Sequence, residues 1–210
     1  MLSTHELSCQ RGRQQLWGNL NLEVAPGELL FVKGANGNGK TSLLKILAGL
    51  LPPDHGQVLW QQQAITKDPY AYRDQLLYIG HQTALKPEMN AIENLIFLAG
   101  LHGLRYGETE ITAALKQWHL QGKTLHLACR QLSQGQKQRV ALAQLNLSQQ
   151  QVWILDEPFN SLDATGASTL AQLLQKHLEA KGILVLTSHL HERGQDMTPP
   201  LDAVEQLLQL

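Results

Sequence analysis

The segment from residue 27 to residue 50 constrains the fold of this 210-residue chain more than any other. An apolar run, residues 29–32, is followed by the glycine-rich loop 34–41 and then by leucines and an isoleucine at helical spacing. The loop matches the pattern G-x-x-x-x-G-K-[ST]. Its glycines let backbone N–H groups turn toward a phosphate chain, and the positive end of the next helix faces the anion. The order strand, loop, helix therefore predicts a phosphate-binding site rather than an ordinary glycine-rich turn.

Two residues of this loop have expected roles in binding a nucleoside triphosphate. Lys40 is placed to hold the β- and γ-phosphates, and the Thr41 hydroxyl is placed to ligate Mg²⁺. The loop and the first residues of the helix together form the expected binding set, which comprises Gly34, Ala35, Asn36, Gly37, Asn38, Gly39, Lys40, Thr41 and Ser42.

A second apolar strand, residues 151–155, ends in the two acids Asp156 and Glu157. Two carboxylates that leave one buried strand are costly unless they have partners. We expect Asp156 to bind Mg²⁺ directly or through water, and Glu157 to polarise the attacking water as a general base. The alternative is a pair of acids that caps a neighbouring helix.

The segment Leu132-Ser133-Gln134-Gly135-Gln136 precedes a further helical run. One interpretation is a capping box, in which Ser133 and Gln136 exchange hydrogen bonds with the first free N–H groups of the helix. The other is a second phosphate-binding surface made of a hydroxyl, a glycine and a helix N-terminus. Spacing alone leaves both interpretations open.

The remaining pattern predicts a parallel α/β sheet interrupted by helices. Apolar strand candidates alternate with helical segments, and the region of about 85–147 is helical and leucine-rich without a good strand candidate. The strand candidates are 29–32, 57–60, 75–81, 151–155 and 182–187, and an amphipathic helix is expected over 164–181. In the tail, the spacing of Leu201, Val204, Leu207 and Leu208 predicts a final packed helix.

Composition excludes several classes of protein. Hydrophobic residues make up 43% of the chain, which indicates one globular domain, and the net charge of −1 gives no general attraction to nucleic acid. Cys9 and Cys129 form no CxxC pair and predict neither a disulfide framework nor a zinc ribbon. The longest apolar run has five residues, 95–99, so no membrane span is expected. The first residues have no hydrophobic signal core, which makes the cytoplasm the default location.

Five features occur in the order found in ATP-binding-cassette (ABC) ATPases, and the match covers nearly the whole chain. They are the loop 34–41, Gln82 after a strand, LSQGQ at 132–136, ILDEP at 154–158, and Ser188-His189 after the last strand candidate. The sequence therefore resembles this family. The resemblance implies an α/β P-loop NTPase fold, with one ATP-binding domain over 1–210, a parallel-sheet core and a helical subdomain at about 85–147.

The resemblance also implies roles for residues that spacing alone does not assign. Gln82 is expected to touch Mg²⁺ and the attacking water, and His189 to contact the γ-phosphate. Ser133, Gly135 and Gln136 would lie on the ATP of a second copy of the chain, which predicts a dimer with ATP between its subunits. Most of the family has an aromatic residue against adenine where this chain has Arg11, whose guanidinium can also stack on a base.

Within the family, three stretches are similar to the ATPase subunits of haem exporters in cytochrome c maturation. They are residues 80–86 together with 91–95, residues 135–145, and residues 153–163. This similarity implies ATP and Mg²⁺ as cofactors, separate integral membrane permease subunits of that system, and a peripheral position on the cytoplasmic face of the inner membrane. The alternatives are the ATPase of another ABC transporter and a soluble ABC ATPase outside transport. A GTPase or kinase with the same loop would leave LSQGQ and His189 unexplained.

Overall fold

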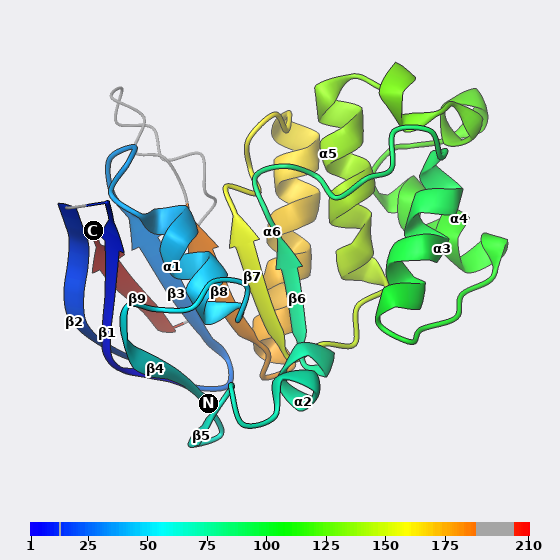
Figure 1. Ribbon diagram of the computed structural model, residues 1–210. Coiled ribbons are helices and arrows are strands. Elements are labelled where there is room, and N and C mark those ends of the chain that lie inside the picture. Colours follow the sequence, from blue (N-terminus) through cyan, green and yellow to red (C-terminus); the bar gives the residue numbers. More distant parts are fainter. Residues whose placement is uncertain (13, 188–203) are drawn as a thin grey trace.

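The computed structural model of the protein describes residues 1–12, 14–187 and 204–210, which form two β-sheets and a group of helices (Figure 1). The larger sheet has five strands in the order β6-β7-β8-β3-β9, and every pair in it is parallel. Its strands are β3 (Glu28–Lys33), β6 (Leu76–Ile79), β7 (Val152–Asp156), β8 (Ile183–Thr187) and β9 (Val204–Gln209). The predicted α/β class with a parallel sheet is confirmed.

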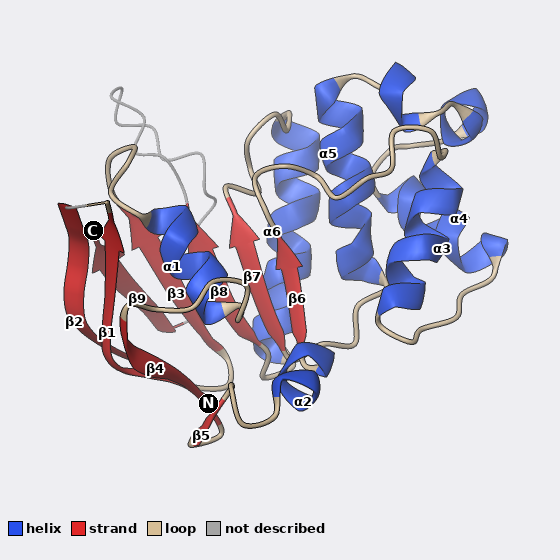
Figure 2. Cartoon of the chain, in the orientation of Figure 1, coloured by secondary structure: helices blue, strands red, loops and turns tan. Residues whose placement is uncertain are grey.

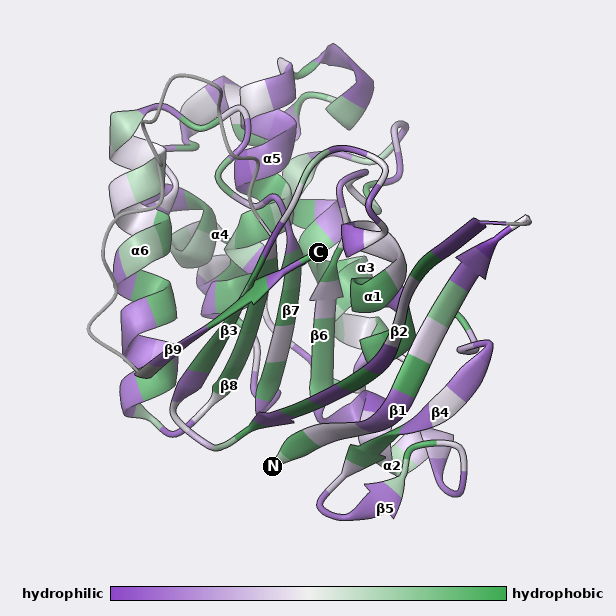
Figure 3. Ribbon diagram, turned by 90° about the vertical axis from the view of Figure 1, so that its left-hand side faces the viewer, coloured by the Kyte–Doolittle hydropathy of each residue, from purple (hydrophilic) through white to green (hydrophobic). Residues whose placement is uncertain are grey.

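The central strands are buried on both faces, as expected for a parallel sheet covered by helices. All five residues of β7 and all five of β8 are buried, and Figure 3 shows the apolar character of these strands. Along β7, Val152 and Ile154 pack in one core cluster with Leu43 of α1 (Lys40–Leu47). Trp153 and Leu155 point the other way, into a second core cluster.

The second core cluster contains the buried leucines of α6 (Ala164–Glu179), so α1 and α6 cover opposite faces of the sheet. In Figure 1, α1 lies in front of the strands and α6 behind them. Because all five strands are parallel, their carboxyl ends lie along one edge of the sheet. The phosphate loop after β3 and the two acids at the end of β7 therefore reach the same edge.

The smaller sheet is antiparallel, with the order β2-β1-β4-β5. Its strands are β1 (Leu2–Arg11), β2 (Gln14–Val24), β4 (His55–Trp60) and β5 (Gln63–Ala64). Only β4 overlaps a strand expected from the sequence. The pairing of β1 with β2 is interrupted by register shifts, so the apolar residues of these strands do not alternate regularly.

The described residues between β6 and β7 contain helices and no strand (Figure 2). They follow α2 (Pro69–Asp74) and β6, and comprise α3 (Ala91–Leu101), α4 (Glu108–Gln117), α5 (Gln134–Leu142) and three 3₁₀ helices, η1 (Gly122–His126), η2 (Cys129–Gln131) and η3 (Ala143–Asn146). In the part of the chain that the structure describes, no helix combines the length and the hydrophobicity needed to cross a membrane.

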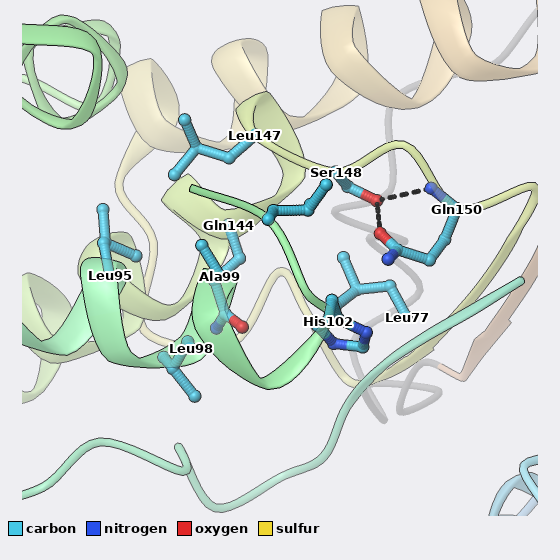
Figure 4. Close-up of a pocket in the computed structure, with 10 residues that line it drawn as sticks. Leu77, Leu95, Leu98, Ala99, His102, Gln144, Leu147, Ser148 and Gln150 are labelled. Atoms are coloured by element: carbon cyan, nitrogen blue, oxygen red, sulfur yellow. Dashed lines mark hydrogen bonds between the residues drawn. The ribbon is translucent and has the colours of Figure 1, made fainter. Parts of the chain in front are cut away.

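The helices join the sheet through an apolar contact, which Figure 4 shows in close-up. Leu95 and Ala99 of α3 face Leu77 of β6 and Leu147, which follows η3. The cavity left between these residues is about 20 Å³, which is room for little more than one water molecule. Burial lowers the pKa of His102 at its rim. This contact is therefore part of the packing and not a ligand site.

The predicted C-terminal helix is wrong, because residues 204–209 form strand β9. The strand pairs in parallel with β3 along its whole length, from Glu28 opposite Val204 to Lys33 opposite Gln209. Without it, one side of β3 would present unpaired backbone groups at the edge of the sheet. In residues 204–209, backbone pairing with β3 therefore outweighs the weak helical spacing of the apolar residues.

Candidate functional site

The phosphate loop turns through two glycines in the left-handed region, Gly37 with φ 89° and Gly39 with φ 91°. Gly39 is also the N-cap of α1. A β-carbon on Gly39 would lie 2.7 Å from Nε1 of Trp17 and 2.9 Å from Cδ1 of Leu16. A side chain there would meet β2 as well as an unfavourable backbone angle, and only glycine fits.

The side chain of Lys40 lies back along the loop. It is 6% exposed, and its Nζ donates to the carbonyl oxygens of Gly34 at 2.7 Å and of Ala35 at 3.1 Å. The ammonium group is thus held at the loop by acceptors that anionic oxygens could replace. The amide of Asn38 donates to the carbonyl oxygen of Leu210 at 2.9 Å, so the residue that follows β9 also supports the loop.

The carboxylate of Asp156 lies between two threonines at the edge of the sheet. Its Oδ2 accepts from the hydroxyl of Thr41 at 2.8 Å, and its Oδ1 accepts from the hydroxyl of Thr187 at 2.7 Å. Asp156 is 2% exposed, and these bonds compensate for its burial. Burial, together with the charge of Asp156, raises the pKa of Tyr78 to about 12. Hydroxyl and carboxylate oxygens are the ligands that Mg²⁺ prefers, so Thr41 and Asp156 fit this ion.

Glu157, the next residue, has a positive φ of 53° and is 9% exposed. A non-glycine residue in this region is strained, and such strain is typical of functional sites. The N–H of Glu157 donates to Thr187 Oγ1 at 2.9 Å. Its Oε2 accepts from Nδ2 of Asn160 at 2.7 Å and lies 3.4 Å from Nδ1 of His81.

A cavity of about 180 Å³ opens at the phosphate loop. It brings together the loop, the second acid of β7 and the end of β1, and its lining residues are Arg11, Leu16, Asn36, Gly37, Gly39, Lys40, Thr41, Ser42 and Glu157. The phosphate loop, two basic residues and one acidic residue therefore line the same space. This arrangement suits a phosphate chain with a reacting water beside it.

Gln82 is exposed and lines a different cavity, of about 460 Å³, together with His81, Leu85, Gln134 and Lys137. Gln82 is therefore not among the described residues that line the phosphate-loop cavity. His81, which precedes it in the chain, lies on the wall of the second cavity and contacts Glu157.

The predicted capping box at the start of α5 is confirmed. The Ser133 N–H donates to Gln136 Oε1 at 2.9 Å, and the Gln136 N–H donates to Ser133 Oγ at 3.2 Å. A β-carbon on Gly135 would lie 3.0 Å from the carbonyl oxygen of Ser161. Ser133, Gly135 and Gln136 are not among the described residues that line the chain's own phosphate-loop cavity.

An ion pair joins α5 to the start of α6. Nη2 of Arg139 donates to Oδ2 of Asp163 at 2.6 Å, while Oδ1 of Asp163 accepts from the Gly166 N–H at 2.9 Å and caps α6. The Gly166 N–H, followed by Arg139, lowers the pKa of Asp163. The segment between Glu157 and α6 is therefore fastened at its far end to α5, the helix that Ser133 caps.

His189, a predicted site residue, lies outside the described residues. The structure adds Thr187, His81, Asn160 and Trp17, which sequence reasoning missed. Thr187 ends a buried strand next to β7, and a polar residue in that place could have indicated a site at the edge of the sheet. No sequence pattern points to Trp17. This residue packs beside Gly39, and that contact depends on how β2 lies against the phosphate loop.

Comparisons with known proteins agree with this geometry. The family model described as ABC transporter matches residues 17–160. The chain is 41% identical to the cytochrome c biogenesis ATP-binding export protein CcmA of Dechloromonas aromatica, over 99% of this chain and 98% of that protein. The protein of the same name from Albidiferax ferrireducens is 44% identical, over 90% of this chain and 89% of its own length.

The fold is also similar to that of a solved ATP-binding cassette, described as dimeric and bound to ADP and Pi. The TM-score is 0.78 at 25% identity, and the match covers 90% of this chain and 88% of the cassette. From the family match, the relatives and the arrangement of the phosphate loop against the acids of β7, the chain belongs to the ABC transporter family.

Proposed function

We propose that this chain is the ATP-hydrolysing subunit of an ABC transporter that acts in cytochrome c biogenesis. Relatives described as cytochrome c biogenesis ATP-binding export proteins, 41% to 44% identical over most of the chain, support the assignment. The observation that carries the ATPase activity is the contact of Thr41 with Asp156, which brings the phosphate loop against the strand that ends in Glu157.

In this proposal the phosphate chain of ATP occupies the cavity over residues 34–42. Backbone N–H groups of the loop bind its oxygens, and Lys40 Nζ exchanges the carbonyls of Gly34 and Ala35 for the β- and γ-phosphates. Arg11 lines the same cavity and is available to stack on adenine. Thr41, Asp156 and Gln82 would hold Mg²⁺, which neutralises charge on the phosphates when it is bound.

Glu157 acts as the general base and takes a proton from the water that attacks the γ-phosphate. Glu157 lines the phosphate-loop cavity, and its Oε2 accepts a hydrogen bond from Asn160. Gln82 orients the water, and His189 contacts the γ-phosphate.

The site is completed by a second copy of the chain. Ser133, Gly135 and Gln136 form a helix N-terminus outside their own phosphate-loop cavity, which supports their use on the ATP of a partner subunit. A related cassette has been solved as a dimer with ADP and Pi. ATP binding would close the pair, and hydrolysis would open it.

The chain works on separate integral membrane permease subunits, and its place is the cytoplasmic face of the inner membrane. We assign residues 1–210 to one ATP-binding domain with a helical subdomain over about 85–147. The cavity beside Gln82 and Leu85 lies between the loop after β6 and the start of α5, and it is a suitable docking place for a permease. The sequence motifs make the haem exporter of cytochrome c maturation the expected assembly.

Two experiments test the proposal. Glu157→Gln should form a stable dimer with ATP in size-exclusion chromatography, while the unaltered chain with ATP returns to monomer as it hydrolyses the nucleotide. Hydrolysis by Glu157→Gln at the unaltered rate would remove Glu157 from the base role. Purification of the tagged chain from solubilised membranes should recover permease subunits of the cytochrome c maturation system. An unrelated permease would point to another transporter, and no membrane partner would point to a soluble ABC ATPase.

A further inference from the structure

Two side chains from different loops converge on one oxygen of Glu157. Nδ2 of Asn160 lies 2.7 Å from Oε2, and Nδ1 of His81 lies 3.4 Å from the same oxygen. Asn160 comes from the segment after the acids, and His81 from the loop that leaves β6. The carboxylate of Glu157 is thus contacted by the segment that follows β7 and by the loop that follows the neighbouring strand β6.

The two sides of the His81 contact differ in exposure. The His81 side chain is 65% exposed, whereas the Glu157 side chain is 8% exposed. Since the last torsion of a glutamate side chain has only broad preferences, rotamers do not fix the plane of its carboxylate. Neighbouring donors must fix it, and His81 is a donor that can be removed without disturbing a buried core.

We propose that His81 is a positioning residue for Glu157, whose Nδ1–H orients the carboxylate for attack of water on ATP. The inference rests on the proposed role of Glu157 as general base. The 3.4 Å separation is longer than a good N–H···O hydrogen bond, and hydrogen bonds of this kind tighten when the substrate occupies the site. His81 acts only through Glu157 and does not touch the reacting atoms.

The competing role for His81 is that of a surface residue of the second cavity, whose wall it shares with Gln82, Leu85 and Lys137. In that case the imidazole would serve contact with a permease and not hydrolysis by the chain alone. The two roles differ in which atom of the ring matters. A positioning role needs a donor at the place of Nδ1, whereas a surface role needs only a polar side chain of similar size.

The test compares three substitutions in the purified full-length chain with Mg-ATP. His81→Asn puts an amide nitrogen near the place of Nδ1, His81→Gln puts it near the place of Nε2, and His81→Ala removes the donor. We expect His81→Ala to lower kcat about tenfold with KM changed less than twofold, since misplacing a catalytic group affects the chemical step. His81→Asn should recover most of this loss, and His81→Gln should not.

A second variant pair separates positioning from a general structural effect. In a Glu157→Gln background, His81→Ala should leave the residual hydrolysis rate unchanged, because the carboxylate on which it acts is absent. An additive loss in that background, an unchanged kcat in His81→Ala alone, or equal recovery by Asn and Gln would each overturn the proposal. Failure of the proposed function would look different, because the unaltered chain would then not hydrolyse ATP.

Discussion

The hydroxyl of Thr41 donates a 2.8 Å hydrogen bond to Oδ2 of Asp156, although 115 positions separate the two residues in the chain. The bond joins the first turn of α1 to the end of β7. It therefore fixes the distance between the place where phosphates bind and the carboxylate of Glu157, the next residue. Because the strands are parallel, the loop after β3 and the acids at the end of β7 lie at the same edge of the sheet. The hydrogen bond then holds Thr41 and Asp156 against each other.

The first prediction concerns this bond. Thr41→Val keeps the shape of the side chain but removes the hydroxyl, so Asp156 loses a donor and the proposed magnesium site loses a ligand. We expect kcat/KM for Mg-ATP to fall on the order of 100-fold, with a matching loss of magnesium-dependent nucleotide affinity. The control is Thr41→Ser, which retains the hydroxyl and should stay within a few-fold of the unaltered chain. Similar kinetics for Val and Ser would show that the hydroxyl has no role.

A second prediction uses two glycines of the loop with nearly equal backbone angles. Gly39 has φ 91°, and a β-carbon there would lie less than 3 Å from atoms of Trp17 and Leu16, whereas Gly37 has φ 89° and a β-carbon there would meet nothing within 4 Å. Both alanine variants carry the left-handed strain of about 1–2 kcal/mol, but only Gly39→Ala must also displace β2.

We therefore expect Gly39→Ala to lower the free energy of unfolding by more than Gly37→Ala, with a difference of about 1–3 kcal/mol from overpacking. Chemical denaturation followed by tryptophan fluorescence measures both, and Trp17 itself reports on the contact. Equal destabilisation by the two variants would mean that the contact with Trp17 and Leu16 does not constrain the loop.

Much of this architecture could be predicted from the sequence, because the parallel strands are short apolar runs and the loop carries its own glycine pattern. The capping box at Ser133 could also be predicted from the sequence, since Ser133 and Gln136, which form it, are three residues apart. Strands β1 and β2 were not, because register shifts interrupt the alternation of their apolar residues, and β9 was not, because it is defined by a distant pairing partner. The helical spacing of the tail was misleading for the same reason, as the open side of β3 is invisible in a linear pattern.

Within the site, sequence could nominate Lys40, Thr41, Asp156 and Glu157, whose places in the motifs follow from their chemistry. It could not nominate Thr187, whose hydroxyl reaches Asp156 only when β7 and β8 are adjacent. It also assigned nothing to His81, although this residue precedes Gln82. Contacts that depend on which loops meet above the sheet have no local sequence signal.

A third prediction concerns Asn94, a fully buried amide that holds the start of the helical region together. Its Oδ1 accepts from the Lys86 N–H at 2.7 Å. Its Nδ2 donates to the carbonyl oxygens of Lys86 at 3.1 Å, Met89 at 3.1 Å and Asn90 at 2.9 Å, and contacts Cys129 Sγ at 3.3 Å. One side chain thus ties the loop after Gln82 to the segment that leads into α5.

Asn94→Asp preserves the shape but replaces the donor with an acceptor that faces these carbonyl oxygens. We expect it to lower the free energy of unfolding by about 3 kcal/mol, the cost of a buried polar group whose partners are lost. The matched control is Asn90→Asp, the same change four residues earlier, where the side chain accepts the cap bond from the Glu93 N–H and Asp can do the same. It should cost less than 1 kcal/mol. Comparable losses from both in urea denaturation would contradict the role of Asn94.

The last prediction is a pH dependence of stability that arises far from the ATP site. His177 of α6 stacks on Trp153 with ring centroids 3.8 Å apart, and its Nε2 lies 3.2 Å from the carbonyl oxygen of Ile183. Burial lowers its pKa from 6.5 to about 4, an effect that the hydrogen bonds to backbone oppose only in part. Between these two values the unfolded chain binds a proton that the folded chain does not, so acidification favours unfolding.

At pH 5 this difference should lower the free energy of unfolding by about 2 kcal/mol relative to pH 7.5. His177→Phe keeps a ring on Trp153 but cannot be protonated, so urea denaturation should show a decline between pH 7.5 and pH 5 that is smaller by that amount. His126→Phe, at an exposed position in η1, is the control and should leave the decline unchanged. If His177→Phe declines as steeply as the unaltered chain, other groups cause the acid sensitivity. The stack of His177 on Trp153 then contributes packing alone, and protonation does not disturb the α6 face of the sheet.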